Sequence, residues 1–350
     1  MRSVLLFTIA VSLSVVAVPR AADDLVTSRF SDYLDALRNQ AGIPGLAVAL
    51  VRPEGTWEHT FGQQDLEHAL PVQGDTPFHL DGTTQIVAAS IILRCVEEGY
   101  FRLDDAIGHL NPTASEPNAT VRQILSHTSG PPDALVYSYR PDRLNWLAPA
   151  MSECAGRTFR GSIAEILNRF AMFDSVPGPD VVTLPPPADG MTPAAIARYT
   201  DALQRLAKPY SSDARGRPAP SQYLVTTLSP AAGLIGSVRD LERFDGALRT
   251  GAIIRADSLT MAWTAALDKN GGRLPHGLGW FVQAYNGERI VWQFGVQDNA
   301  SSSLVITVPG RAMTLVMVAN SQGLSRPFAL SGGDVTVSPF ARTFLSLFIR

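Results

Sequence analysis

The stretch that decides the fold is Thr76-Pro77-Phe78-His79-Leu80-Asp81-Gly82-Thr83-Thr84-Gln85, which leads into an apolar helical pattern from Ile86 to Gly99. A short polar turn followed by an apolar run of this length predicts a helix packed inside the protein. Gly82 and Gln85 are three residues apart and therefore lie on the same face at the start of this helix. Gly82 has no side chain, and the amide of Gln85 is not a base.

Five further segments carry similar information, and they occur in a fixed order along the chain. Together with the opening stretch they resemble the serine β-lactamase and penicillin-binding-protein family, especially its class C and D-alanyl-D-alanine carboxypeptidase-like branch. The most specific of them ends in His-Thr-Ser-Gly at residues 127–130. The segments are Ile43–Val51, Val96–Gly99 with Leu103–Asp105, Val121–Gly130, Ala231–Leu241 and Gly277–Trp280.

The resemblance implies an α/β (α+β) fold of the β-lactamase/transpeptidase type. We expect an antiparallel sheet flanked by the terminal helices, an inserted and mainly helical subdomain, and a cleft between the two parts. The sheet part would comprise about 25–78 and 221–350, and the helical part about 79–220. Apolar alternation predicts strands at Ser303–Val308 and Thr314–Val318, and a last helix at about Pro339–Phe348.

The family's first motif is Ser-x-x-Lys, in which the lysine accepts the proton of the attacking serine. Here the serine aligns with Gly82 and the lysine with Gln85. The chain has only two lysines, Lys208 and Lys269, and neither has a serine three positions earlier. The motif is therefore absent from the whole sequence. Losing a nucleophile of this type typically costs on the order of 10⁶ in turnover.

The resemblance also places the second and third motifs. Tyr-x-Asn is best matched by Tyr139-Arg140-Pro141, with Tyr137-Ser138-Tyr139 as a competing register; Tyr139 would keep the phenol, whereas Pro141 lacks the amide. Lys-Thr-Gly or His-x-Gly, expected on an edge strand, aligns with Gln293-Phe294-Gly295. Gln293 and Gly295 are the candidate substrate-binding residues, although Gln293 could equally be a solvated edge residue.

Two residues of the His-Thr-Ser-Gly segment, His127 and Ser129, are expected to hold their turn through side-chain to backbone hydrogen bonds.

Composition and the chain's beginning restrict the location and the partners. The 350 residues are 45% hydrophobic and 17% charged with a net charge of −3, which is typical of a soluble protein and gives no basic stripe for nucleic acid. Arg2, the apolar stretch Val4–Val18 and a cleavage zone at Pro19–Ala22 predict a signal peptide over residues 1–22, before a domain at 23–350. The alternative is an uncleaved N-terminal anchor. We expect a periplasmic or secreted protein without a transmembrane segment after signal removal.

Cysteines and histidines indicate no metal or cofactor chemistry. Cys95 and Cys154, the only cysteines, both fall in helical patterns. Export permits a disulfide between them, but we expect two thiols buried in helices to remain unpaired. The six histidines show no spacing typical of a zinc site. We expect neither a metal nor another cofactor.

Three functional interpretations remain open. The first is an inactive homologue, a pseudoenzyme, that keeps its cleft to bind a peptidoglycan-related peptide, a β-lactam-like ligand or a partner protein. The second is a weak hydrolase of β-lactamase, D-Ala-D-Ala carboxypeptidase or esterase type that uses Thr83 or Thr84. Neither threonine has a base three residues later, and the turn of about 100° per residue would aim its hydroxyl elsewhere. The third is the product of a decaying gene, with no present role.

Overall fold

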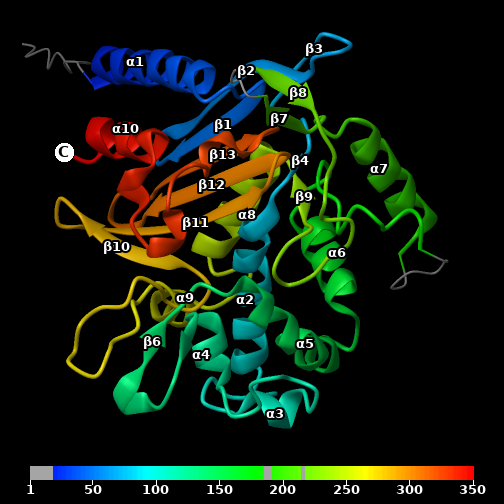
Figure 1. Cartoon of the computed structure of the whole chain (residues 1–350), viewed down its shortest axis with the longest axis vertical. Coiled ribbons are helices and arrows are strands. Elements are labelled where there is room, and N and C mark those ends of the chain that lie inside the picture. The colour runs from blue at the N-terminus through cyan, green and yellow to red at the C-terminus, as the bar shows by residue number, and fades with distance from the viewer. Residues whose placement is uncertain (1–18, 185–190, 214–216) are drawn as a thin grey trace, which may run out of the picture.

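A seven-stranded antiparallel sheet forms the centre of the molecule, in the order β10-β11-β12-β13-β1-β2-β3 (Figure 1). The structure is a computed structural model that describes residues 19–184, 191–213 and 217–350. The predicted antiparallel sheet and mixed fold class are confirmed. The strands are β1 (Gly45–Arg52), β2 (Gly55–Asp65), β3 (Leu70–Pro71), β10 (Phe281–Tyr285), β11 (Glu288–Gln297), β12 (Ser301–Val308) and β13 (Met313–Ala319).

Strand β1 lies inside the sheet, between β13 and β2. The register is fixed by pairs such as Val48 with Met317 of β13 on one side and Val48 with His59 of β2 on the other. All residues of β1 except Arg52 are buried. An uninterrupted apolar strand of this kind requires cover on both faces of the sheet.

The two ends of the chain supply the cover on one face. Helices α1 (Pro19–Gln40) and α10 (Pro339–Phe348) lie side by side there (Figure 1). Phe30 of α1 and Phe344 of α10 are wholly buried, with their ring centroids 6.3 Å apart. The hydroxyl of Ser338 caps α10 by accepting from the N–H of Ala341. The last helix has the predicted bounds.

The opposite face of the sheet packs against α8 (Val238–Arg249), and the helical part lies beyond it. Leu241 and Phe244 of α8 share one buried cluster with Ala49 of β1 and Val316 of β13. Helix α2 (Thr84–Glu97) runs from the sheet into the helical part (Figure 1). The other helices are α3 (Ile107–Leu110), α4 (Val121–Leu125), α5 (Ala148–Ala155), α6 (Phe159–Arg169), α7 (Pro193–Gln204) and α9 (Ala256–Ala262).

Among the described residues, three short antiparallel strand pairs lie outside the main sheet. They are β4 (Phe78–His79) with β9 (Ile235–Gly236), β5 (Thr128–Ser129) with β6 (Val136–Tyr137), and β7 (Tyr210–Ser212) with β8 (Pro218–Pro220). The pair β4–β9 lies directly before α2, so it fixes the turn at which the helix begins. The exact limits of the sheet and helical parts remain predictions.

A disulfide joins Cys95 of α2 to Cys154 of α5, with Cα atoms 5.9 Å apart. The expectation that these cysteines stay unpaired was wrong. Both residues are buried, as expected, but α2 and α5 pack against each other and bring them together. The bond closes a sequence separation of 59 residues and ties the central helix to the helical part.

The chain's beginning lies mostly outside the described residues. Pro19–Ala22, the expected cleavage zone, forms the start of α1, and the predicted apolar stretch before it is not described. The signal peptide and its cleavage therefore stay predictions. No helix within residues 19–184, 191–213 and 217–350 is long and apolar enough to cross a membrane.

Candidate functional site

Gly82 lies in a short 3₁₀ turn, Asp81–Thr83, that leads directly into α2. Its backbone is not left-handed, so conformation does not require a glycine there. The lack of space beside Gly82, however, does require a glycine. A Cβ atom at Gly82 would lie 2.6 Å from the carbonyl oxygen of Phe294 in β11 and 3.4 Å from the Cα of Gly295. A nucleophilic side chain would therefore need β11 or the turn to move.

Gly295 makes the reciprocal approach. A Cβ there would lie 2.2 Å from the carbonyl oxygen of Leu80 and 2.8 Å from the amide nitrogen of Gly82. Glycines at both positions thus let the backbone of the turn and the backbone of β11 pack directly against each other. Main chain thus leaves no room for a side chain at Gly82, the position that the sequence resemblance aligns with the family's nucleophile.

Gln85 and Tyr139 are brought together beside this contact. The side-chain amide of Gln85 donates to the Tyr139 hydroxyl at 2.7 Å, and Gln85 is wholly buried. Its Nε2 would lie 3.2 Å from a Cβ at Gly82. The structure therefore brings Gly82, Gln85 and Tyr139 together, and the roles assigned to them stay predictions. A neutral amide stands where the family has a base.

Tyr139 lies in an aromatic cluster that keeps its phenol neutral. Its ring is 4.6 Å from that of His127, 5.3 Å from Phe281 and 5.4 Å from Phe294, measured between centroids. Burial raises the pKa of Tyr139 well above its usual value, although the hydrogen bond from Gln85 opposes this. The phenol can donate or accept a hydrogen bond, but it is not a base near neutral pH.

The predicted turn-holding role of His127 is consistent with its contacts. Its Nδ1 accepts from the N–H of Arg140 at 3.2 Å, and its ring packs edge-on against His276 at 4.6 Å. Burial lowers the pKa of His127 well below its usual range and that of His276 to about 4. Both imidazoles are therefore neutral and act as packing groups. The role assigned to Ser129 stays a prediction.

The hydroxyls of Thr83 and Thr84 do not face an opening. Ser303 donates to the carbonyl of Leu80 at 2.7 Å, so the Thr83 hydroxyl, 2.7 Å from Ser303, is the donor in that pair. The Thr84 hydroxyl accepts from the N–H of Leu234 at 3.2 Å. Both threonines are wholly buried. These contacts support the expectation that neither hydroxyl is aimed at a substrate.

Gln293 is not a solvated residue of an edge strand. It lies in β11, which has β10 outside it, and it is wholly buried. Its amide donates to the carbonyl of Gly279 at 3.3 Å, while its Oε1 accepts from the N–H of Phe294. Side chains alternate along a strand, so Phe294 and Gln293 point to opposite faces. The assignment of Gln293 and Gly295 as ligand contacts stays a prediction.

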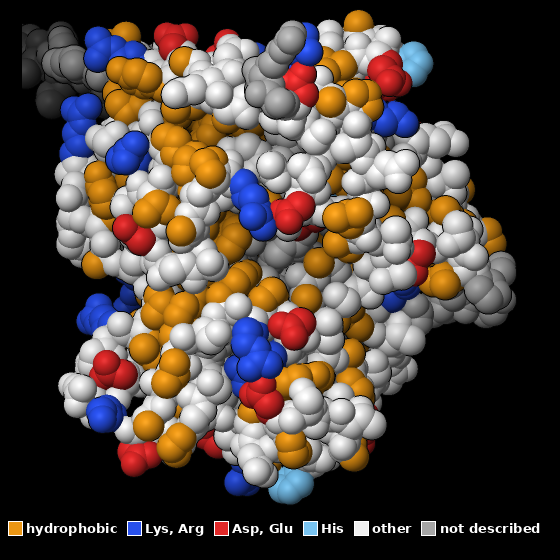
Figure 2. Space-filling model, viewed as in Figure 1, with side chains coloured by type: hydrophobic (Ala, Val, Ile, Leu, Met, Phe, Trp, Pro, Cys, Tyr) orange, Lys and Arg blue, Asp and Glu red, His pale blue; other side chains and the backbone are white. Residues whose placement is uncertain are grey.

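A large groove begins beside Tyr139 and Phe294, with a volume of about 1240 Å³. This groove, called the Tyr139 groove below, is lined by the end of α1, by segment 322–331 and by the start of α10. Its described lining does not include Gly82, Gln85, Gln293 or Gly295. Figure 2 shows hydrophobic side chains gathered across the middle of this face, between the sheet part and the helical part.

Sequence reasoning did not find this groove or the residue that anchors the turn. Asp81 is buried with a left-handed backbone (φ 48°). Its carboxyl accepts from Gln297 Nε2 at 3.0 Å and from the Ser301 hydroxyl at 2.7 Å. Burial raises its pKa to about 6, against these two hydrogen bonds. The only signal in the sequence was a charged residue, Asp81, between Leu80 and Gly82; its positive φ is known only from the structure.

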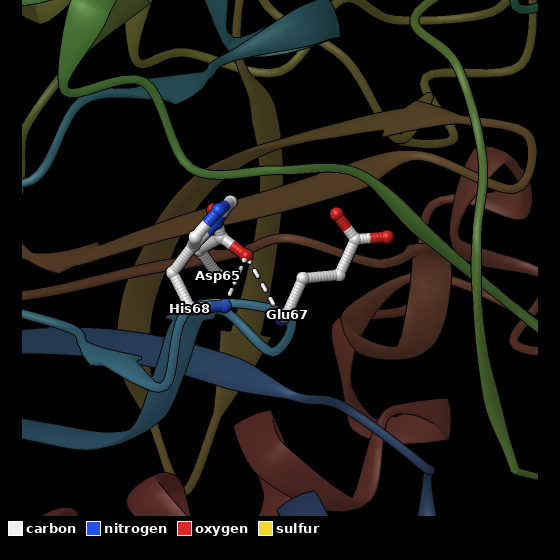
Figure 3. Close-up of side chains that lie close together, drawn as sticks. All are labelled: Asp65, Glu67 and His68. Carbon is white, nitrogen blue, oxygen red and sulfur yellow. Dashed lines mark hydrogen bonds and ion pairs between the residues drawn. The ribbon is translucent and has the colours of Figure 1, made fainter.

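Three further polar residues lie together on the turn after β2, namely Asp65, Glu67 and His68 (Figure 3). One ligand atom from each lies within 4.8 Å of the others. Asp65 accepts from the N–H groups of Glu67 and His68, and its other oxygen is 2.8 Å from His68 Nδ1. These bonds explain the cluster as a closed turn, with Glu67 and His68 exposed, and we assign no metal to it.

Comparison with known proteins identifies the family. A family model described as Beta-lactamase matches residues 30–171 and 178–331. The Esterase EstB of Burkholderia gladioli is 29% identical over 128 residues, which are 35% of this chain and 33% of the esterase. The chain thus matches only about a third of that relative's length.

Solved structures of low sequence identity share the fold. A penicillin-binding protein homologue from Pyrococcus abyssi, described as octameric, has a TM-score of 0.71 at 16% identity, over 91% of this chain and 77% of that one. A class C β-lactamase from Rhodobacter sphaeroides has a TM-score of 0.67 at 16% identity, over 92% of this chain and 99% of that one.

Proposed function

Because the chain belongs to the β-lactamase family but lacks its nucleophile and base, we propose that it is a catalytically silent, exported member that uses the Tyr139 groove for binding. One observation carries the proposal. A Cβ at Gly82 would lie only 2.6 Å from the Phe294 carbonyl oxygen, so the position aligned with the family's nucleophile lacks room for a side chain as well as lacking the nucleophile.

The remaining polar groups near Gly82 support the absence of catalysis rather than catalysis by another nucleophile. Gln85 has replaced the base, and the raised pKa of Tyr139 keeps its phenol protonated. The hydroxyls of Thr83 and Thr84 are occupied inside the protein. A weak hydrolase that uses one of these threonines would need that threonine's own buried hydrogen bond to break before attack. Within the part of the chain that the structure describes, no contact favours that alternative.

The binding part of the proposal rests on the Tyr139 groove. Ligand sites are usually concave and mostly apolar with a few polar groups, and volumes of about 300–1,000 Å³ are typical. The Tyr139 groove, at about 1240 Å³, is large enough for a peptide or for a small molecule. Peptidoglycan-related peptides, β-lactam-like ligands and a partner protein are the occupants we propose to test. Export is proposed from the N-terminal sequence pattern alone.

The test is the intact mass of folded protein after incubation with a penicillin panel and with a fluorophosphonate. Cooperative thermal unfolding of the same sample establishes that the protein is folded. We expect no covalent adduct from either reagent. A stoichiometric adduct would overturn the proposal, and peptide mapping would then identify the nucleophile. A Thr83→Ala, Thr84→Ala double variant shows whether either threonine forms it.

A further inference from the structure

The Tyr139 groove combines an apolar wall with positive charge. Its apolar side chains include Phe294 and Val296 of β11, Phe328, and Val337 just before α10. Val337 is 40% exposed, so part of this wall faces solvent. Apolar surface of this kind gains free energy when a ligand covers it, in proportion to the area removed from water.

The charged lining residues are arginines. Of the described residues that line the groove, two are arginines, Arg326 and Arg342, and none is Asp or Glu. The chain as a whole carries a net charge of −3, so this local positive charge is not a reflection of overall composition. A lining that is positive on a negative protein favours an anionic ligand over a neutral or cationic one.

The two arginines differ in how far they are already neutralised. Arg326 forms an exposed ion pair with Asp298 at 2.8 Å, which lies outside the described lining. Arg342, in the first turn of α10, is exposed and has no ion-pair partner among the described residues. Its guanidinium is therefore the group available to hold an anion, and it matches the two oxygens of a carboxylate in geometry.

On this basis, and resting on the proposed binding function, we infer that the Tyr139 groove takes a carboxylic acid with an extended apolar chain. Arg342 binds the carboxylate at the rim, and the chain lies against Phe328, Val337 and Phe294. Because the described lining does not include Gly82, the acid binds beside the closed attack position and undergoes no reaction. A free fatty acid and an N-acylated amino acid both have this chemistry.

Calorimetric titration of folded protein tests the inference with four probes below their aggregation limits. Decanoate and N-octanoyl-alanine represent the two sources of the acid, decanol removes the charge, and acetate removes the chain. We expect both amphipathic acids to bind with one site, decanol to bind more weakly, and acetate not to bind measurably. The tighter of the two acids identifies the source.

Three variants assign the contacts. Arg342→Gln should weaken decanoate roughly tenfold or more, the range of a charge-assisted hydrogen bond, and leave decanol unchanged. Val337→Ser should weaken decanoate and decanol alike. Arg289→Gln is the matched control, since Arg289 is an exposed arginine on β11 outside the described lining, and it should change neither.

The possible negative results of this titration can be told apart from one another and from failure of the proposed function. Equal binding of decanoate and decanol, or an Arg342→Gln effect no larger than that of Arg289→Gln, would overturn the carboxylate assignment and leave the groove as an apolar site. No binding of either acid would overturn the ligand class. Neither result bears on catalytic silence, which the covalent-adduct experiment decides separately.

Discussion

Replacement of Gly82 by alanine tests the closed attack position by adding one carbon atom. That Cβ would lie 2.6 Å from the Phe294 carbonyl, a distance that real Cβ contacts essentially never show. The neighbour is backbone of an interior strand, so relief requires β11 or the turn to shift. Overpacking of this kind costs about 1–3 kcal/mol, and we expect Gly82→Ala to lower the free energy of unfolding by that amount.

Gly246 provides a matched control. It lies in α8, has no left-handed φ, and a Cβ there would meet nothing within 4 Å. Gly246→Ala should therefore raise the free energy of unfolding by about 0.4–1 kcal/mol, because alanine restricts the unfolded chain and favours the helix. The two substitutions are chemically identical, and only their surroundings differ.

Urea unfolding followed by circular dichroism measures both variants. Equal m-values would show that the midpoints report stability rather than a change in the surface exposed. Stabilisation by Gly82→Ala, together with stabilisation by Gly246→Ala, would refute the reasoning. It would mean that the turn before α2 and β11 leave room for a side chain, and the attack position would then be vacant rather than closed.

Three further outcomes are expected. Gly82→Ser with Gln85→Lys should give no efficient β-lactam hydrolysis, since the serine lacks space and the lysine would be buried where Gln85 is wholly buried; rapid turnover in a chromogenic assay would contradict this. Cys95→Ala with Cys154→Ala should lose about 4 kcal/mol of stability, from the loop entropy of a 59-residue separation, and urea midpoints that match those of the wild type would argue against the bridge. Asp81 has a folded-state pKa of about 6 against 3.8 for the unfolded chain. The neutral form of Asp81 is favoured in the folded protein. Its contribution of about 3 kcal/mol to the free energy of unfolding is therefore complete below pH 3.8 and is lost as pH rises through about 6. The stability difference between Asp81→Asn and the wild type should change across this window, and a difference that is constant from pH 4 to 7 would show that Asp81 does not titrate there.

The sequence alone determined the elements and the missing chemistry. The apolar alternation of Ser303–Val308 and the pattern of Pro339–Phe348 are local, so they predicted a strand and a helix close to their actual bounds. Gly82 and Gln85 could be assigned because one helical turn fixes their shared face. No tertiary information is needed to see that glycine has no nucleophile.

The tertiary structure decided everything that depends on distant segments meeting. Three contacts illustrate this: Gln293 with Gly279, 14 positions apart, Cys95 with Cys154, 59 positions apart, and Gly82 with Phe294 of β11, about 210 positions apart. The Tyr139 groove likewise needs both ends of the chain. Local patterns fix which face of an element is apolar, but not which element covers it. That choice is made by close packing of the whole interior, where a single Cβ decides whether the attack position is open or closed.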